Sequence, residues 1–188
     1  MKVGVLALQG AFAAHQSRLA SLDVAAPAVR VPADLDGLDG VVLPGGESTT
    51  MSRLLITSGL HEPLRAAINA GLATFGTCAG MILCATDVHD GRADQVGFDQ
   101  IDMTVQRNGY GRQLDSFEAD LDVAGLDAPF HAVFIRAPLV ERAGDDVEVL
   151  ARHEGRPVLL RDRRCTVAAF HPELTDDARL HEQFVAAI

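Results

Sequence analysis

The sequence predicts an α/β fold, with one domain built on a mixed, mostly parallel sheet that helices flank. In the first half of the chain, short apolar runs with little alternation are separated by stretches that carry apolar residues at helical spacing. Such runs are typical of strands covered on both faces, and their alternation with helices is typical of βαβ units. In the second half, apolar and polar residues alternate, as in half-exposed antiparallel strands. No repeat, low-complexity segment or linker divides the chain, so we expect residues 1–188 to form a single domain.

The first half of the chain predicts strands at 3–8, 28–31, 38–43 and 73–77. Helices are expected at 11–22, from the capping hydroxyls of residues 48–50 to Gly59, from about Glu62 to Gly71, and at 81–85. In parallel sheets, ligands bind beyond the carboxyl ends of the strands. Three loops fall at those ends, and we expect them to converge on one site: residues 9–10, 44–48 and 76–80.

The second half predicts strands at 101–105, 117–121, 132–135, 147–151, 157–160 and 166–170. Residues 87–94 are polar and are expected to form a loop. A closing helix is expected at 176–188, because Leu180, Phe184 and Ile188 share one face of it.

The charge and the cysteine content exclude several classes of function. The chain has 16 basic and 26 acidic residues, and its net charge of −10 argues against a nucleic-acid-binding surface. The apolar N-terminus lacks the cleavage pattern of a signal peptide and is too short to span a bilayer, so we expect no membrane segment. Three cysteines without a C-x-x-C pair favour a reducing cytosol, and we expect a cytoplasmic protein. No cluster of His, Cys, Asp and Glu has the spacing of zinc ligands, and we predict no metal and no cofactor.

Cys78 is the first candidate catalytic residue. Gly76-Thr77-Cys78-Ala79-Gly80 reads Gly-x-Cys-x-Gly between an apolar strand and an apolar helix, the pattern of a nucleophile elbow with cysteine in place of serine. Small residues allow the sharp turn, and the N–H groups after its apex favour a thiolate and an oxyanion. The alternative is a buried structural cysteine at a tight turn. The other two cysteines, Cys84 and Cys165, are expected to be core or boundary residues.

A catalytic thiol needs a base, and the base needs an acid that orients it. His171 ends an apolar strand in Phe170-His171-Pro172-Glu173. Residues two apart in an extended segment point the same way, so Glu173 can hold the ring of His171. The alternative is a His-Pro turn beside a surface carboxylate. The remaining histidines lack such a setting, and three of them are expected on helices among charged or polar neighbours: His15, His61 and His181.

The loop Gly45-Gly46-Glu47-Ser48 is the expected source of an oxyanion donor. Glycine lets a backbone N–H approach a substrate closely, and the helix that begins near Ser48 adds a favourable dipole. A phosphate cradle is the alternative, although the loop lacks the spacing and the lysine of a P-loop.

Together these residues resemble the triad-type class I glutamine amidotransferases. That family combines a Gly-x-Cys-x-Gly elbow, a Pro-Gly-Gly oxyanion loop and a late His-Pro-Glu, and all three occur here in that order. The implied fold is the flavodoxin-like fold of the class. Over nearly the whole chain, the sequence is similar to the glutaminase subunits of pyridoxal 5′-phosphate synthase, in residues 8–10, 43–51, 75–80, 111–118, 134–138 and 170–175.

The resemblance implies hydrolysis of L-glutamine to glutamate and ammonia, with Cys78 as nucleophile, His171 as base and Glu173 as its orienter. The N–H groups of Gly46 and Ala79 would form the oxyanion hole. The positions that would hold glutamine are Gly46, Glu47, Ser48, Arg107, Ile135 and Arg136. Gln9 falls where the family has a residue near the oxyanion loop and the partner interface. The ammonia would pass to a separate (β/α)₈ barrel subunit of pyridoxal 5′-phosphate synthase in a hetero-oligomer.

Three other functions stay open on the sequence. A cysteine hydrolase or peptidase of a related α/β fold would use the same elbow. A non-enzymatic assembly subunit would keep the fold without using Cys78. A glutaminase serving another synthase, such as imidazole glycerol phosphate synthase, would share the triad.

Overall fold

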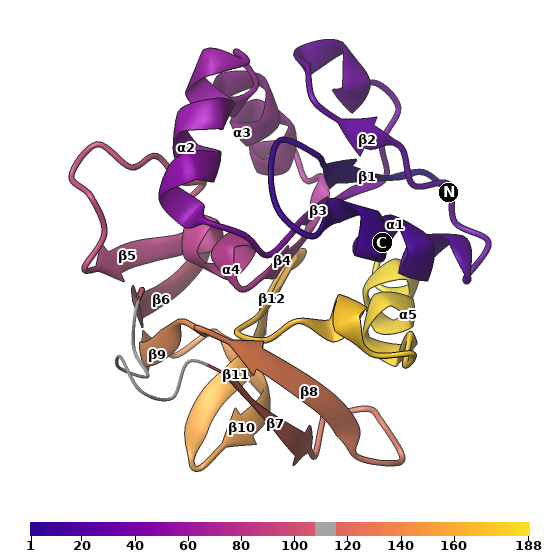
Figure 1. The fold of residues 1–188 in the computed structure, drawn as a ribbon, viewed down its shortest axis with the longest axis vertical. Helices are drawn as coiled ribbons and strands as arrows, with labels where there is room; N and C mark the ends of the chain where they lie inside the picture. Colours follow the sequence, from indigo (N-terminus) through magenta and orange to yellow (C-terminus); the bar gives the residue numbers. More distant parts are fainter. Residues whose placement is uncertain (108–115) are drawn as a thin grey trace.

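A seven-stranded sheet runs through the middle of the molecule (Figure 1), and the computed structural model describes residues 1–107 and 116–188. Its strand order is β10-β11-β12-β4-β3-β1-β2. The strands are β1 (Val3–Leu6), β2 (Ala28–Val29), β3 (Gly40–Leu43), β4 (Ala73–Thr77), β10 (Glu148–His153), β11 (Arg156–Asp162) and β12 (Cys165–Ala168). The five strands from β2 to β12 pair in parallel, whereas β12, β11 and β10 pair antiparallel. The predicted mixed, mostly parallel sheet is therefore confirmed.

Helices cover both faces of this sheet. They are α1 (Phe12–Ala20), α2 (Ser48–Thr57), α3 (His61–Asn69), α4 (Ala79–Cys84) and α5 (Arg179–Ala186), with single 3₁₀ turns η1 (Pro32–Leu35) and η2 (Pro172–Leu174). Figure 1 shows α1 and α5 together on one face, with α2, α3 and α4 on the other. Each predicted helix is present. Where an observed helix end differs from the predicted one, it lies one to three residues inside the predicted range, except that α3 and α4 begin earlier than predicted. The strands between them are buried on both faces, which explains their continuous apolar runs.

Two smaller sheets extend the molecule beyond β12. One contains β5 (Ala85–His89), β6 (Ile101–Gln106) and β9 (Leu139–Ala143), and the other is the antiparallel pair β7 (Ser116–Leu121) and β8 (Phe130–Ile135). The alternating patterns of β6 and β7 are confirmed as strands with one face more buried than the other. Together with the large sheet they close over one apolar cluster, whose largest members include Phe75, Phe98 and Phe130.

Three local predictions need correction. Residues 87–94 were expected to form a loop, but the first three of them belong to β5. The exposed side chains of β5 show no apolar pattern, and the strand forms because it pairs with β6. The strand β9 has no counterpart in the prediction. The cap of α2 is the side chain of Glu47, which accepts the N–H groups of Thr49 and Thr50, and not a hydroxyl of residues 48–50.

Residues 111–115 of the segment 111–118, and the neighbouring residues 108–110, lie outside the described residues. In the part of the chain that the structure describes, no helix combines the length and the apolar character needed to cross a bilayer.

Candidate active site

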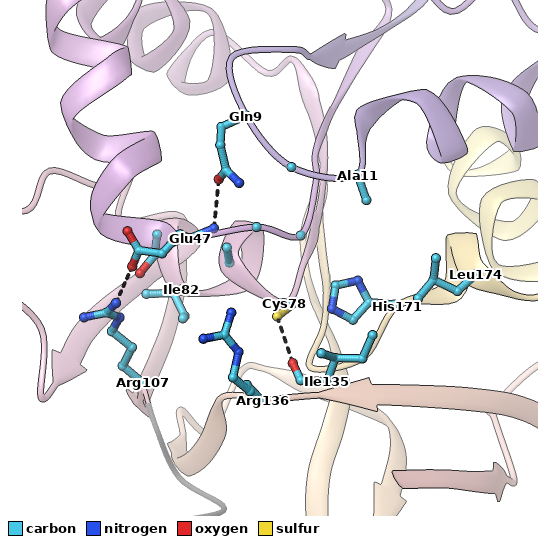
Figure 2. A pocket seen from close by; sticks show the side chains of 15 residues that line it. Gln9, Ala11, Glu47, Cys78, Ile82, Arg107, Ile135, Arg136, His171 and Leu174 are labelled. Atoms are coloured by element: carbon cyan, nitrogen blue, oxygen red, sulfur yellow. Dashed lines mark hydrogen bonds and ion pairs between the residues drawn. The ribbon is translucent and has the colours of Figure 1, made fainter. Parts of the chain in front are cut away.

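A pocket of about 320 Å³ lies at the carboxyl ends of β1, β3 and β4 (Figure 2). The three loops predicted to converge do so, since each contributes to the lining of this pocket. The second half of the chain adds five lining residues: Arg107, Ile135, Arg136, His171 and Leu174. The volume falls in the range of small-molecule sites, so the pocket has room for an amino acid.

Cys78 occupies the apex of the elbow between β4 and α4 with φ 49° and ψ −103°. This positive φ is unusual for a residue with a side chain and is found where the surrounding structure holds it in place. The turn depends on its glycines: a Cβ on Gly80 would lie 1.9 Å from the carbonyl oxygen of Leu43, and one on Gly76 would lie 2.7 Å from that of Gly80. The elbow therefore presents the thiol at the floor of the pocket, as the Gly-x-Cys-x-Gly pattern predicts.

His171 and Glu173 follow β12, where the chain turns into η2. His171 Nδ1 and Glu173 Oε1 are 2.7 Å apart, and both residues are less than a tenth exposed. Burial disfavours a charged imidazole, but interactions with Cys78 and Glu173 outweigh it and raise the pKa of His171 to about 10. At neutral pH this site therefore holds an imidazolium next to the sulfur of Cys78.

The thiol of Cys78 donates a long hydrogen bond, 3.8 Å, to the carbonyl oxygen of Ile135 at the end of β8. The same sulfur also interacts with His171. In sites without substrate, catalytic hydrogen bonds are often long or poorly aligned and tighten when the substrate binds.

The loop of Gly45 and Gly46 packs directly against the histidine. A Cβ on Gly45 would lie 2.3 Å from His171 Cε1, and one on Gly46 would lie 2.5 Å from Gln9 Oε1. Gly45 accepts the N–H of Ala11 at 3.0 Å, and Gln9 Oε1 accepts the N–H of Glu47 at 2.8 Å. The loop that carries Gln9 therefore holds the Gly45–Gly46 loop against the base.

Ala79 follows the thiol as the first residue of α4. The N–H groups in the first turn of a helix have no intrahelical acceptor, so that of Ala79 is available to a ligand. Gly46 and Ala79 both line the pocket, as the oxyanion-hole prediction requires of their positions.

Glu47 and Arg107 form an ion pair at the other end of the pocket (Figure 2). Burial disfavours the carboxylate, but hydrogen bonds from Thr49 and Thr50 prevail and lower the pKa of Glu47 to about 2. Next to Glu47, Ser48 is buried, and among the described residues its hydroxyl finds no hydrogen-bond partner.

Ile135 and Arg136 reach the pocket from the end of β8. Arg136 has φ 43°, a second strained residue in the pocket lining. Figure 2 shows its guanidinium between Arg107 and Cys78. Two arginines thus face the same cavity, which suits a ligand with a carboxylate.

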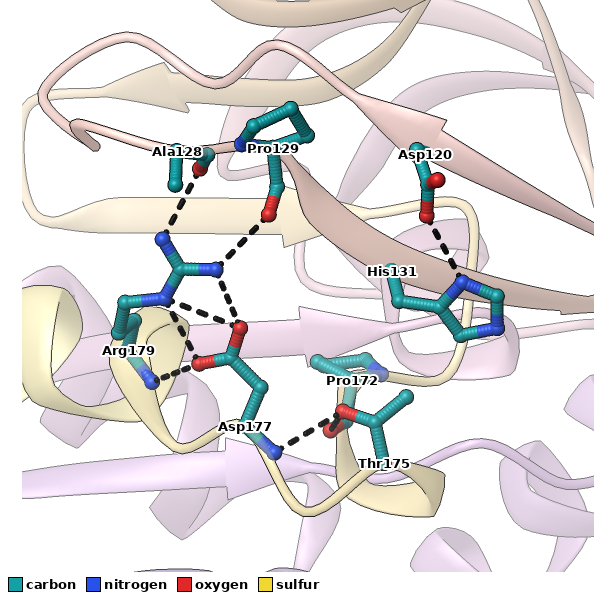
Figure 3. A network of polar contacts seen from close by, with 8 residues as sticks. All are labelled: Asp120, Ala128, Pro129, His131, Pro172, Thr175, Asp177 and Arg179. Atoms are coloured by element: carbon teal, nitrogen blue, oxygen red, sulfur yellow. Dashed lines mark hydrogen bonds and ion pairs between the residues drawn. The ribbon is translucent and has the colours of Figure 1, made fainter.

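A polar clamp holds the segment that follows the base (Figure 3). Arg179 binds both oxygens of Asp177 and donates to the carbonyl oxygens of Ala128 and Pro129, each at 2.9 Å. The neighbouring Thr175 hydroxyl donates to the carbonyl oxygen of Pro172 at 3.4 Å. The clamp ties the chain after His171 to the residues that precede β8, and so to the strand that ends in Ile135.

His15, His61 and His181 lie on helices, as predicted, and all three are buried. His15 lies 3.3 Å from Glu173 and 2.9 Å from His181, and it contacts the Thr77 hydroxyl at 3.1 Å. A sequence signal was available: His15 falls three residues after Phe12 and four before Leu19, on the apolar face of its helix. Cys84 and Cys165 are buried at the ends of their elements, as predicted.

Within the described residues, no group of three or more His, Cys, Asp or Glu side chains is arranged to hold a metal ion. The pocket itself offers a thiol, an imidazole, a carboxylate and two guanidinium groups.

A cysteine at a strand-to-helix elbow, backed by a buried His–Glu pair at the edge of a parallel sheet, defines a class of α/β proteins with a nucleophilic thiol. The model of the SNO glutamine amidotransferase family matches residues 5–188, and the chain belongs to that family.

Individual relatives are similar along their full length. A pyridoxal 5′-phosphate synthase subunit PdxT of Mycobacteroides abscessus is 55% identical over 183 residues, covering 97% of this chain and 95% of the relative. The protein of the same name from Frankia alni is 56% identical over 185 residues, covering 98% and 93%. A crystal structure of a glutamine amidotransferase superposes with a TM-score of 0.93 at 46% identity, covering 98% of this chain and 97% of that one.

Proposed function

We propose that the chain, acting as one glutaminase domain over residues 1–188, hydrolyses L-glutamine to glutamate and ammonia and supplies the ammonia to pyridoxal 5′-phosphate synthesis. The observation that carries this proposal is the buried Glu173–His171 pair beside Cys78, in a pocket whose far end holds Arg107 and Arg136. Such a pocket combines an activated nucleophile with groups that suit an amino-acid carboxylate.

The first half of the reaction forms a thioester. The Cys78 thiolate attacks the side-chain carbonyl carbon of glutamine, and the N–H groups of Gly46 and Ala79 stabilise the resulting oxyanion, each contributing about 3 kcal/mol to the transition state. His171 donates its proton to the leaving nitrogen, the C–N bond breaks, and ammonia departs from a γ-glutamyl thioester. Glu173 keeps the imidazole oriented and stabilises its charged form.

The second half returns the free thiol. His171, now neutral, takes a proton from a water molecule that attacks the thioester carbonyl. The C–S bond breaks, glutamate leaves, and the imidazolium and the thiolate are restored. No redox step or external reagent is needed.

Recognition of glutamine is assigned to the far end of the pocket. Arg107 and Arg136 suit its α-carboxylate, and Glu47 suits its α-ammonium group. The buried hydroxyl of Ser48 supports this assignment, because a buried polar group without a protein partner is expected to find one in a ligand. The remaining members of the binding set are Gly46 and Ile135, which line the same cavity.

The partner is a second subunit of pyridoxal 5′-phosphate synthase, and we propose that it is a (β/α)₈ barrel that receives the ammonia. Support comes from the relatives named above, which are subunits of that synthase. Gln9 lines the pocket and accepts the N–H of Glu47, so a partner that docks at Gln9 can move the oxyanion donors. With its sparse cysteines, the chain suits a reducing cytoplasm.

The test is an assay of glutamate release by the wild type and by Cys78→Ala, each alone and with the barrel subunit. We expect the wild type to hydrolyse glutamine faster in the complex, and Cys78→Ala to lose activity by at least about 10³-fold in both states. Equal activity of Cys78→Ala would overturn the assignment of the nucleophile. Preference for peptides or esters over glutamine would point instead to a cysteine hydrolase.

A further inference from the structure

The carboxylate of Glu173 has a second neighbour behind the catalytic pair. Its Oε1 faces His171 at 2.7 Å, while its Oε2 lies 3.3 Å from Nε2 of His15 on α1. The same His15 nitrogen is 3.1 Å from the hydroxyl of Thr77, the residue immediately before Cys78. His15 and Thr77 are fully buried and Glu173 is 2% exposed, so water does not compete for these contacts.

The protonation of His15 follows from its surroundings. Burial, followed by electrostatic interaction with His181 and His171, lowers the pKa of His15 well below its ordinary value. His15 is therefore neutral and carries one N–H. A carboxylate only accepts hydrogen bonds, so this proton belongs on Nε2, and Nδ1 is left as an acceptor.

His181 on α5 completes the arrangement from behind. Its Nε2 is 2.9 Å from His15 Nδ1, and burial together with Arg18 lowers the pKa of His181 to about 4. His181 is thus also neutral, and its N–H points to His15. The polar groups around His15 are therefore His181 from α5, Glu173 and His171 from the η2 segment, and Thr77 from β4. Arg18 of α1 acts on His181.

We propose that His15 is a positioning residue for the Glu173–His171 pair, a role that rests on the glutaminase function proposed above. Its Nε2–H is hydrogen-bonded to Thr77 and lies 3.3 Å from Glu173 Oε2, a buried oxygen that has no hydrogen-bond partner among the described residues. One neutral donor thus supports both the acid of the triad and the strand that ends at the nucleophile. A charged group here would compete with His171 for the carboxylate, whereas a neutral N–H fixes its orientation without doing so.

Removing this N–H takes away the polar group that lies against Oε2 of Glu173, and the carboxylate is then free to turn away from His171. A loss of alignment at the base affects the chemical step more than substrate binding, because the pocket groups that bind glutamine are elsewhere.

The experiment compares His15→Leu with His15→Gln in the assembled synthase, measuring glutamate release against pH. The amide nitrogen of Gln reaches the position of His Nε2, whereas Leu offers no donor. We expect His15→Leu to lower kcat by roughly 10- to 100-fold with KM nearly unchanged, and to move the alkaline limb of the profile to lower pH. His15→Gln is expected to recover most of the kcat. The matched control is His61→Leu, which removes a buried histidine of α3 that contacts Gly97 and not the triad, and it should leave kcat and the limb unchanged.

A folded His15→Leu with the kcat and the pH profile of the wild type would overturn the proposal, as would a His15→Gln no more active than His15→Leu. If His15→Leu fails to fold, His15→Asn replaces it, because its amide nitrogen reaches the position of Nδ1 instead. Equal activity of the Gln and Asn variants would then overturn the proposal. Failure of the glutaminase function itself is distinguished by Cys78→Ala, which would then be as active as the wild type.

Discussion

Cys78, His171 and Glu173 are each less than a tenth exposed, whereas Glu47 and Arg107 at the other end of the same pocket have side chains 34% and 24% exposed. The first group sits on an elbow, a strand end and a 3₁₀ turn that pack against the core. The second group lies where a loop enters α2 and where β6 ends. The fold thus fixes the nucleophile side of the pocket. The far side is formed by side chains that are free to exchange partners.

This difference separates chemistry from recognition. The charged His171–Glu173 contact is formed before any substrate arrives. Glu47 and Arg107 instead neutralise each other, and we expect glutamine, which brings one charge of each sign, to replace that contact with two new ones. Changes on the nucleophile side should therefore lower kcat, and changes on the far side should raise KM.

The largest effect is expected for Glu173→Gln. The amide keeps the shape of the side chain but removes the charge that stabilises the imidazolium, so kcat should fall by roughly 10²- to 10⁴-fold with little change in KM. Steady-state kinetics of glutamate release by the synthase complex measure this. A rise in KM without a fall in kcat would contradict the assignment of chemistry to the nucleophile side of the pocket and of substrate binding to the far side.

A smaller effect is expected for Gly45→Ala. Its Cβ would lie 2.3 Å from a His171 ring that Glu173 holds in place, so the ring or the loop must move, and kcat should fall by roughly 10- to 100-fold. Gly46→Ala is the matched comparison, because its Cβ meets the end of the flexible Gln9 side chain. Equal losses in the two variants would mean that the base is less firmly held than its contacts indicate.

On the far side, Arg107→Met is expected to raise KM several-fold and leave kcat within about twofold, since it removes a charge used in binding only. The expected substrate partner is the α-carboxylate, so the change in KM should be smaller with a glutamine analogue whose α-carboxyl is amidated. A fall in kcat without a change in KM would contradict this role.

Glu47→Gln adds an effect on stability. Since the pKa of Glu47 is lowered to about 2 from 4.5, its ionised form stabilises the fold above about pH 4.5, and this stabilisation is lost as the pH falls towards 2. The variant should be less stable than the wild type by about 1 kcal/mol at pH 7, the usual size of a lost helix cap, and the gap should shrink at pH 3. Urea unfolding of both proteins at the two pH values measures it. A gap that widens in acid would contradict the cap assigned to this carboxylate.

The smallest effect on catalysis is expected for Arg179→Ala. The clamp to Asp177, Ala128 and Pro129 lies outside the pocket, so the variant should melt at a slightly lower temperature with kcat and KM close to those of the wild type. A large loss of kcat would mean that the clamp determines the position of His171.

Much of this architecture could be predicted because local pattern and tertiary role agree. The strands of the parallel sheet are buried on both faces and read as apolar runs, and Cys78 stands in a motif whose glycines the elbow requires. Where pairing alone makes the structure, prediction failed: β5 has exposed side chains and forms only beside β6.

The candidate site divides in the same way. Residues in short motifs, such as His171 and Glu173, could be found from the sequence because both partners lie two positions apart. His15 and Glu173 are 158 residues apart and meet only when α1 packs beside the turn after β12, so no local pattern links them. The same holds for Glu47 and Arg107, whose ion pair joins the two halves of the chain.

The most direct test of a preassembled nucleophile side is the pH dependence of kcat/KM for glutamine in the assembled synthase, with glutamate as the measured product. Because the pKa of His171 is raised to about 10, the imidazolium that protonates the leaving ammonia persists well above neutrality, and the activity should fall only as the pH approaches 10. In Glu173→Gln, this alkaline fall in activity should occur at lower pH. A wild-type limb near 6.5, the ordinary value for histidine, or a limb that Glu173→Gln leaves in place, would contradict the account.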